Sequence, residues 1–181
     1  DEVDELVKTH ERLVEESERR IEELLERNRR LIERITERAK ELLKENKRLI
    51  EEITEVLKRG SDEKDIERLL RELEKHVRET NEESKRMLDE LRKHVEDTNR
   101  ETKKLNDDLN DSVKKIEDRI KDKDVLERLK DSNRKANERH KRMNEENKRL
   151  LEDVERRIKE LNKRNEDLLR EAEKRVRDER R

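Results

Sequence analysis

The stretch VLKRGSDEKDI, residues 56–66, holds the single glycine of the 181-residue chain and sets the place where its first helix ends. Two basic residues before Gly60 suit the negative end of a helix dipole, and glycine closes helices because it reaches the left-handed conformation without a Cβ clash. Ser61 or Asp62 then offers a side-chain oxygen that caps a following helix. The stretch therefore predicts a short turn between two helices.

Upstream of this turn, apolar and small polar residues recur at steps of three and four. This spacing indicates one face of a single long helix, which we expect from about residue 3 to 59. The residues on that face are Val3, Val7, His10, Val14, Ser17, Ile21, Leu24, Asn28, Leu31 and Ile35.

Downstream, the second break has no glycine and is found from the phase of the apolar stripe at about 100° per residue. Residues from Leu73 to Ile120 keep their apolar positions on one side, whereas Val125, Leu126 and Leu129 fall on the opposite side. A continuous helix would have to bury both sides, so we expect a turn near residues 121–123, with Asp124 and Glu127 as N-cap and N3 residues. We expect helices at about 62–120 and 124–179, and such short connections make neighbouring helices antiparallel.

Inward positions also coincide when the sequence is shifted by 18 residues, as in the series His10, Asn28, Asn46 and the series Leu73, Leu91, Leu109. Eighteen residues are five helical turns, so the stripes do not drift and no left-handed supercoil is needed. The fold class is all-α: residues 1–181 form a single, straight, antiparallel bundle of three long helices. The width of the stripes leaves open whether three helices complete the core or await a fourth.

Composition excludes several classes of function. Charged residues make up 59% of the chain, but 52 basic residues nearly cancel 54 acidic ones, and no basic stretch is free of acidic neighbours. There is no cysteine and no apolar run of the length that a membrane span requires. We expect no nucleic-acid partner, no small-molecule ligand, no cofactor and a soluble chain.

Polar residues interrupt the inward stripes. If helix-one residue i lies beside residue 122 − i, and helix-two residue j beside residue 244 − j, they gather into three clusters that could form interhelical hydrogen bonds. Alternatively, many of them lie at stripe edges and contact water, as we expect for Asn110 and Asn137. The first cluster is Asn46, His76, Thr80, Asn81, Ser84, Asn162 and Asn165; the second is Asn28, His94, Thr98, Asn99, Thr102, Asn144 and Asn147; the third is His10, Ser17, Asn106, Ser112, Ser132, Asn133 and His140.

The four histidines, His10, His76, His94 and His140, are candidate pH sensors, because a buried neutral imidazole resists protonation. In this interpretation the fold loses stability in mild acid; in the alternative, the histidines are ordinary hydrogen-bonding groups. His10 lies near the centre of its stripe, and we expect the other three toward the edges. No His-x3-His pair suggests a metal site, and no carboxylate takes a central position that would favour catalysis.

The Asn46–His76 and Asn28–His94 layers resemble those of de novo designed helical bundles with buried hydrogen-bond networks, including bundles whose histidines respond to pH. The absence of Phe, Trp, Tyr, Pro and Cys is in keeping with that resemblance. It implies a recombinant structural protein without a natural activity or localisation. The chain departs from the homotrimeric hairpin members of that group in having three helices, and we expect a monomer, with a homo-oligomer or a partner helix as the alternative. Membrane contact is conceivable only after opening in acid.

Overall fold

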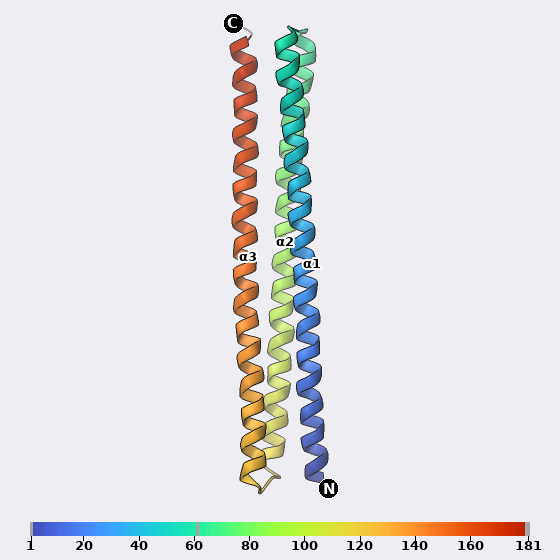
Figure 1. The fold of residues 1–181 in the computed structure, drawn as a ribbon, viewed down its shortest axis with the longest axis vertical. Coiled ribbons are helices and arrows are strands. Elements are labelled where there is room, and N and C mark those ends of the chain that lie inside the picture. Colours follow the sequence, from blue (N-terminus) through green and yellow to red (C-terminus); the bar gives the residue numbers. More distant parts are fainter. Residues whose placement is uncertain (1, 61, 180–181) are drawn as a thin grey trace. The chain divides into compact units, whose positions relative to one another are not determined.

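The computed structural model describes residues 2–60 and 62–179. They form three α-helices: α1 (Glu2–Arg59), α2 (Glu63–Glu117) and α3 (Lys123–Glu179) (Figure 1). No strand occurs in these residues, so the all-α fold class with three long helices is confirmed.

The first turn occurs at the glycine, as the sequence predicts. Gly60 has a φ of 67°, in the left-handed region, and its N–H donates to the carbonyl of Leu57 over 3.3 Å. Asp62 caps α2: its carbonyl accepts from the Asp65 N–H over 3.0 Å, and its Oδ1 accepts from the Lys64 N–H over 3.4 Å. Ser61, the other candidate cap, lies outside the described residues.

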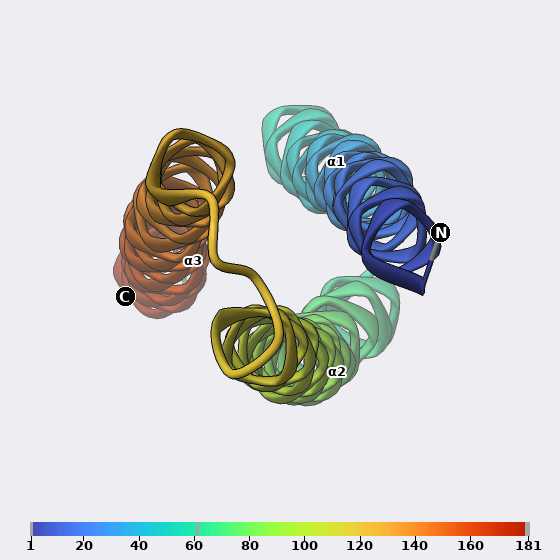
Figure 2. The same ribbon diagram turned by 90° about the horizontal axis from the view of Figure 1, so that it is seen from below.

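The second turn differs from the sequence prediction at both of its ends. The helix α2 ends at Glu117 instead of residue 120, and the N–H of Ile120 closes the end by donating to the Ile116 carbonyl over 2.9 Å. Asp122, not Asp124, caps α3, because its Oδ1 accepts from the Asp124 N–H over 3.0 Å. The connection then crosses from α2 to α3 (Figure 2). Several aspartates in this stretch can cap a helix, and periodicity alone does not choose between them.

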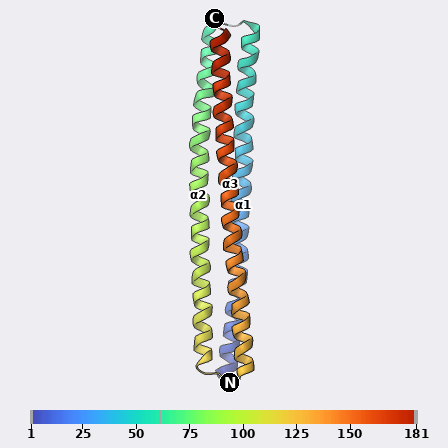
Figure 3. The same cartoon turned by 90° about the vertical axis from the view of Figure 1, so that its left-hand side faces the viewer.

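The described residues group into two units, each built from one segment of all three helices. Unit 1 comprises residues 2–30 and 92–151, and unit 2 comprises residues 31–60, 62–91 and 152–179. Within each unit the α1 and α3 segments run in one direction and the α2 segment runs in the other (Figures 1 and 3). Each unit therefore has a three-helix core of its own.

Apolar clusters and polar layers alternate inside each unit. The core of unit 2 closes its turn end with Leu49, Ile53, Leu69, Leu73, Val77, Ala172 and Val176. Unit 1 has one cluster of Ile116, Ile120 and Leu129 at its turn end, and another of Val14, Leu109 and Ala136. Among the described residues no large apolar side chain is exposed. The polar side chains between these clusters form the candidate site.

Candidate functional site

His10 of α1 is buried in unit 1, with 1% of its surface exposed. Its Nδ1 lies 3.0 Å from Oγ of Ser112 on α2, while Nε2 has no hydrogen-bond partner in the described chain. Burial lowers the pKa of His10, and the nearby Glu11 carboxylate opposes that effect only in part. The imidazole is therefore held in its neutral form with one ring nitrogen unpaired.

His140 of α3 is as deeply buried as His10, although the sequence suggested a position toward the edge of its stripe. It is 1% exposed. Its Nδ1 contacts Oδ1 of Asn106 on α2; since that oxygen only accepts, Nδ1 carries the proton. Nε2 is buried and has no partner in the part of the chain that the structure describes. Burial, and secondarily the charge of Arg139, lowers the pKa of His140 to about 4.

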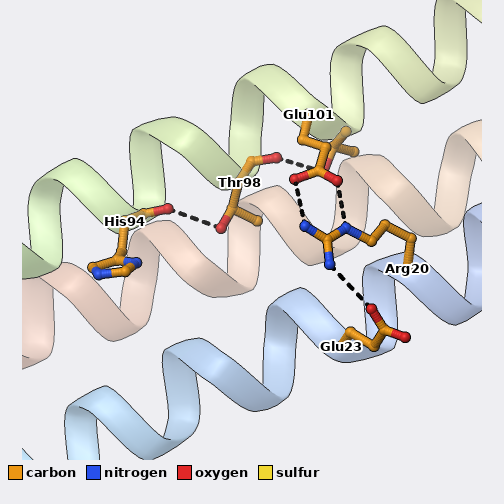
Figure 4. A network of polar contacts seen from close by, with 6 residues as sticks. Arg20, Glu23, His94, Thr98 and Glu101 are labelled. Atoms are coloured by element: carbon orange, nitrogen blue, oxygen red, sulfur yellow. Dashed lines mark hydrogen bonds and ion pairs between the residues drawn. The ribbon is translucent and has the colours of Figure 1, made fainter.

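His76 and His94, both on α2, are only half-buried, as expected for stripe edges. The Nδ1 of His76 contacts Oδ1 of Asn46 on α1, as the first predicted cluster requires. The backbone carbonyl of His94 accepts the Thr98 hydroxyl over 2.8 Å, as Figure 4 shows. These two histidines therefore differ from His10 and His140 in their exposure to solvent.

Buried threonines of α2 donate within their own helix and can accept from a neighbour. Thr80 donates to the His76 carbonyl over 2.8 Å, and Thr102 donates to the Thr98 carbonyl over 2.7 Å. The Thr98 hydroxyl also accepts from the Asn28 amide of α1 over 3.4 Å. The threonine donors are thus paired without help from the other helices.

Three asparagines connect α2 and α3 in unit 1. The Asn133 amide donates to Oδ1 of Asn110 over 2.7 Å, and the Asn137 amide donates to the same oxygen over 3.2 Å. The expectation that Asn110 and Asn137 merely face water is therefore wrong in part: Asn110 is exposed, yet its oxygen is a shared acceptor.

The other expected network residues divide by burial. The buried ones are Asn28, Asn46, Thr80, Ser84, Thr98, Thr102, Asn133, Asn147 and Asn165. Half-buried are Asn81, Ser112, Ser132, Asn144 and Asn162. Asn99 is exposed, because its position falls outside the inward stripe of α2. The Asn81 amide reaches the Glu166 carboxylate of α3 over 3.4 Å.

Many buried amides lack partners within the described chain. Both amide atoms of Asn147 and both of Asn165 are unpaired, although these side chains are 1% and 0% exposed. Further unpaired atoms occur in Asn46, Asn81, Ser84, Asn133, Asn137, Asn144 and Asn162. Each buried unpaired group costs on the order of 1–3 kcal/mol, and native proteins contain few of them.

Arginine clamps that sequence reasoning missed connect α1 to α2. In unit 1, Arg20 contacts both carboxylate oxygens of Glu101 and also pairs with Glu23 over 3.0 Å (Figure 4). In unit 2, Arg38 donates to both oxygens of Glu83, over 2.6 and 3.2 Å, and pairs with Glu41 over 3.1 Å. Each residue of the second clamp is 18 positions from its counterpart, so the repeat of the inward residues could have revealed them.

Other kinds of site are not evident in the part of the chain that the structure describes. It contains no group of three or more His, Asp or Glu side chains placed to hold a metal ion. None of its helices combines the length and the apolar composition that crossing a membrane requires. The polar layers are therefore the feature from which a function can be argued.

Comparison with known proteins adds little. No protein-family model matches the chain, and no curated protein matches it. Among solved structures it is similar to a computationally designed three-helix bundle, at 17% sequence identity and a TM-score of 0.49, over 99% of this chain and 84% of that one.

Proposed function

We propose that the chain is a designed structural protein without a natural biochemical activity, whose buried Asn, Ser, Thr and His side chains specify how its helices pack and make the fold acid-sensitive. The observation that carries this proposal is the burial of His10 and His140 to 1% exposure, each with an Nε2 that has no hydrogen-bond partner among the described residues. A second proton would add both a charge and an unpaired donor inside the core.

The direction of the pH effect follows from linkage. A histidine titrates near 6.5 when unfolded, whereas His140 titrates near 4 when folded, so the unfolded state binds more protons between these values. The stabilisation is full above about pH 6.5 and is lost as the pH falls toward 4. A depression of this size corresponds to on the order of 3 kcal/mol for His140 alone.

The test is urea unfolding between about pH 7.5 and about pH 4.5. In the native chain the free energy of unfolding should fall with pH, and the double variant His10→Asn, His140→Asn should remove most of that slope. The matched control is His76→Asn, His94→Asn, which changes two half-buried rings and should keep the slope. If the double variant keeps the native slope as well, the acid response does not come from the buried histidines.

A second candidate function, an interaction module, is favoured by a different observation. The unpaired amides of Asn147 and Asn165 are the kind of group that a partner helix could satisfy. Sedimentation at two protein concentrations tests self-association. A species with the mass of a monomer at both concentrations excludes a homo-oligomer and leaves a separate partner helix as the form of this candidate.

A further inference from the structure

Two hollows lie along the seam between α1 and α3 in unit 2. The first encloses about 150 Å³ and the second about 170 Å³. The walls of the first hollow include Thr36, Ala39, Leu43, Val154, Ile158 and Leu161. Ile50, Ile53, Leu168 and Ala172 contribute to the second. Thr54, Glu171 and Arg175 also line the second hollow. Apolar residues of both helices thus occur at two levels of the seam.

These levels are two helical turns apart on both helices. Leu43 and Ile50 are seven residues apart on α1, and so are Leu161 and Leu168 on α3. Seven residues span on the order of 10 Å along a helix. A helix lying on the seam would therefore meet the hollows with apolar side chains at positions i and i+7.

A polar layer lies between the two levels. Asn46 precedes Ile50 on α1, and Asn165 precedes Leu168 on α3. Both side chains are completely buried. The Asn46 Nδ2 and both amide atoms of Asn165 have no partner in the described chain. A docked helix that carried an amide or hydroxyl between its two apolar residues would offer these atoms a donor and an acceptor.

The rim of the first hollow is basic. Lys40 and Arg157 line it from opposite helices, and no carboxylate is among its lining residues. Each cation has a partner in its own helix, Lys40 with Glu37 over 3.7 Å and Arg157 with Asp153 over 3.3 Å. Acidic residues that flank the apolar face of a docking helix would complement this rim.

Among the described residues, the polar contacts across this seam are weaker than those between α1 and α2. On the other side of α1, Arg38 is clamped to both oxygens of Glu83. Across the α1–α3 seam, Arg175 donates to the Thr54 hydroxyl over 3.5 Å, at the limit of a hydrogen bond. Because Asn165 is fully covered in the free chain, a docking helix reaches it only when α1 and α3 part. The Arg175 contact opposes that movement little, and the apolar cluster that contains Ile53 and Ala172 opposes it at the second hollow.

We propose that the α1–α3 seam of unit 2 is a docking site for one amphipathic helix of a separate polypeptide, with apolar residues at i and i+7, an amide or hydroxyl side chain between them and acidic flanks. This helix-in-groove binding rests on the second candidate function, the interaction module. It adds to that function the location of the docking site, the spacing of the apolar residues on the partner helix and the chemistry of that helix.

The test uses two synthetic helical peptides of about 25 residues, long enough to form a helix. Both carry leucines at i and i+7 and glutamates on the flanks; one carries asparagine at i+4, and the other carries leucine there. Fluorescence anisotropy of the labelled peptides with the full chain should show binding with a preference for the asparagine peptide. The variant Asn165→Leu should reverse that preference, which a purely structural role for Asn165 would not do.

Three further variants locate the site. Ala39→Trp fills the first hollow and should reduce affinity at least tenfold while circular dichroism shows an intact fold. Lys40→Glu with Arg157→Glu should also weaken binding, whereas the matched control Lys44→Glu with Lys163→Glu, on exposed positions, should leave it unchanged. Binding that Ala39→Trp does not reduce would place the partner elsewhere and overturn this seam as the site, but would leave the interaction module standing.

Two other results would overturn the proposal in different ways. If neither peptide binds and the chain has the mass of a monomer at both concentrations, both the docking site and the interaction module fail. If the chain self-associates and Ala39→Trp abolishes that association, the occupant is a second copy of this chain and not a separate polypeptide. The acid response of the proposed structural function is measured independently and is affected by neither result.

Discussion

The Nδ1 atom of His10 lies 3.0 Å from the Ser112 hydroxyl oxygen and joins the buried faces of α1 and α2. Because the Nε2 atom of the same ring has no partner, this hydroxyl is the group that pairs the imidazole within the described chain. The polar interior of unit 1 thus depends on a serine that is itself half-buried.

Ser112→Ala should therefore destabilise the chain at neutral pH. It leaves both ring nitrogens of His10 unpaired, and an unpaired buried group costs on the order of 1–3 kcal/mol. Urea unfolding at neutral pH measures the loss. Ser132→Ala, at a half-buried serine of the same predicted cluster, is the control and should change the unfolding free energy much less. Equal effects of the two substitutions would contradict the role of this contact.

The arginine clamps should contribute modestly and in a salt-dependent way. In the clamp of unit 2 the Arg38 side chain is 47% exposed and the Glu83 side chain is 29% exposed, so solvent screens the pair. A double-mutant cycle with Arg38→Met and Glu83→Gln should give a coupling of about 0.5–1 kcal/mol that shrinks in high salt. A coupling that salt leaves unchanged would contradict this account.

The clamp also sets the pH below which carboxylates, and not only histidines, contribute to the loss of stability. Arg38 lowers the pKa of Glu83, so the stabilisation from this carboxylate is present above its unfolded value near 4.5 and is lost as the pH falls below it. Loss of stability between about pH 6.5 and about pH 5 is therefore attributable to histidines, and carboxylates contribute below that.

Acid should loosen unit 1 before unit 2. Unit 1 contains His10 and His140, both 1% exposed, whereas the histidine of unit 2 is the half-buried His76. Amide hydrogen exchange near pH 5, corrected for intrinsic rates, should show lost protection in residues 2–30 and 92–151 first. In the variant His10→Asn, His140→Asn the two units should lose protection alike. A uniform loss of protection in the native chain would argue against an origin of the acid response at His10 and His140.

Gly60→Ala should cost about 1 kcal/mol through the backbone alone. The φ of Gly60 is 67°, which an L-residue adopts only with strain, yet a Cβ built there meets no atom within 4 Å. Thermal unfolding measures the change. Gly60→Asn is the informative comparison, because asparagine tolerates this conformation and should cost less than alanine. The reverse order would show that backbone strain is not the cause.

Much of the fold could be predicted because helical periodicity and turn chemistry are local properties. The expected pairing of residue i with residue 122 − i is confirmed by His10 with Ser112 and by Asn46 with His76, each pair summing to 122. The second pairing is shifted slightly, since His140 with Asn106 sums to 246 and not 244.

The features that could not be predicted depend on distances between side chains of different helices. A helical wheel places Asn147 and Asn165 on inward faces, but it does not tell whether an amide on a facing helix is within reach. It also placed His140 too near an edge, because small differences in helix rotation decide between 1% exposure and partial hydration. The Arg20 and Arg38 clamps escaped notice since charged residues occur all along the outer faces.

Asn147→Leu should stabilise the chain. Both amide atoms of Asn147 are buried and have no partner among residues 2–60 and 62–179, and leucine of similar volume replaces them with apolar surface. The free energy of unfolding should therefore rise by about 1–2 kcal/mol. Asn28→Leu is the matched control, because the Asn28 amide donates to Thr98 over 3.4 Å and its removal loses a hydrogen bond. The free energy of unfolding should therefore rise less in the control than in Asn147→Leu. Urea unfolding of both variants at neutral pH measures the difference, and a loss of stability in Asn147→Leu would mean that this amide is paired in the folded protein.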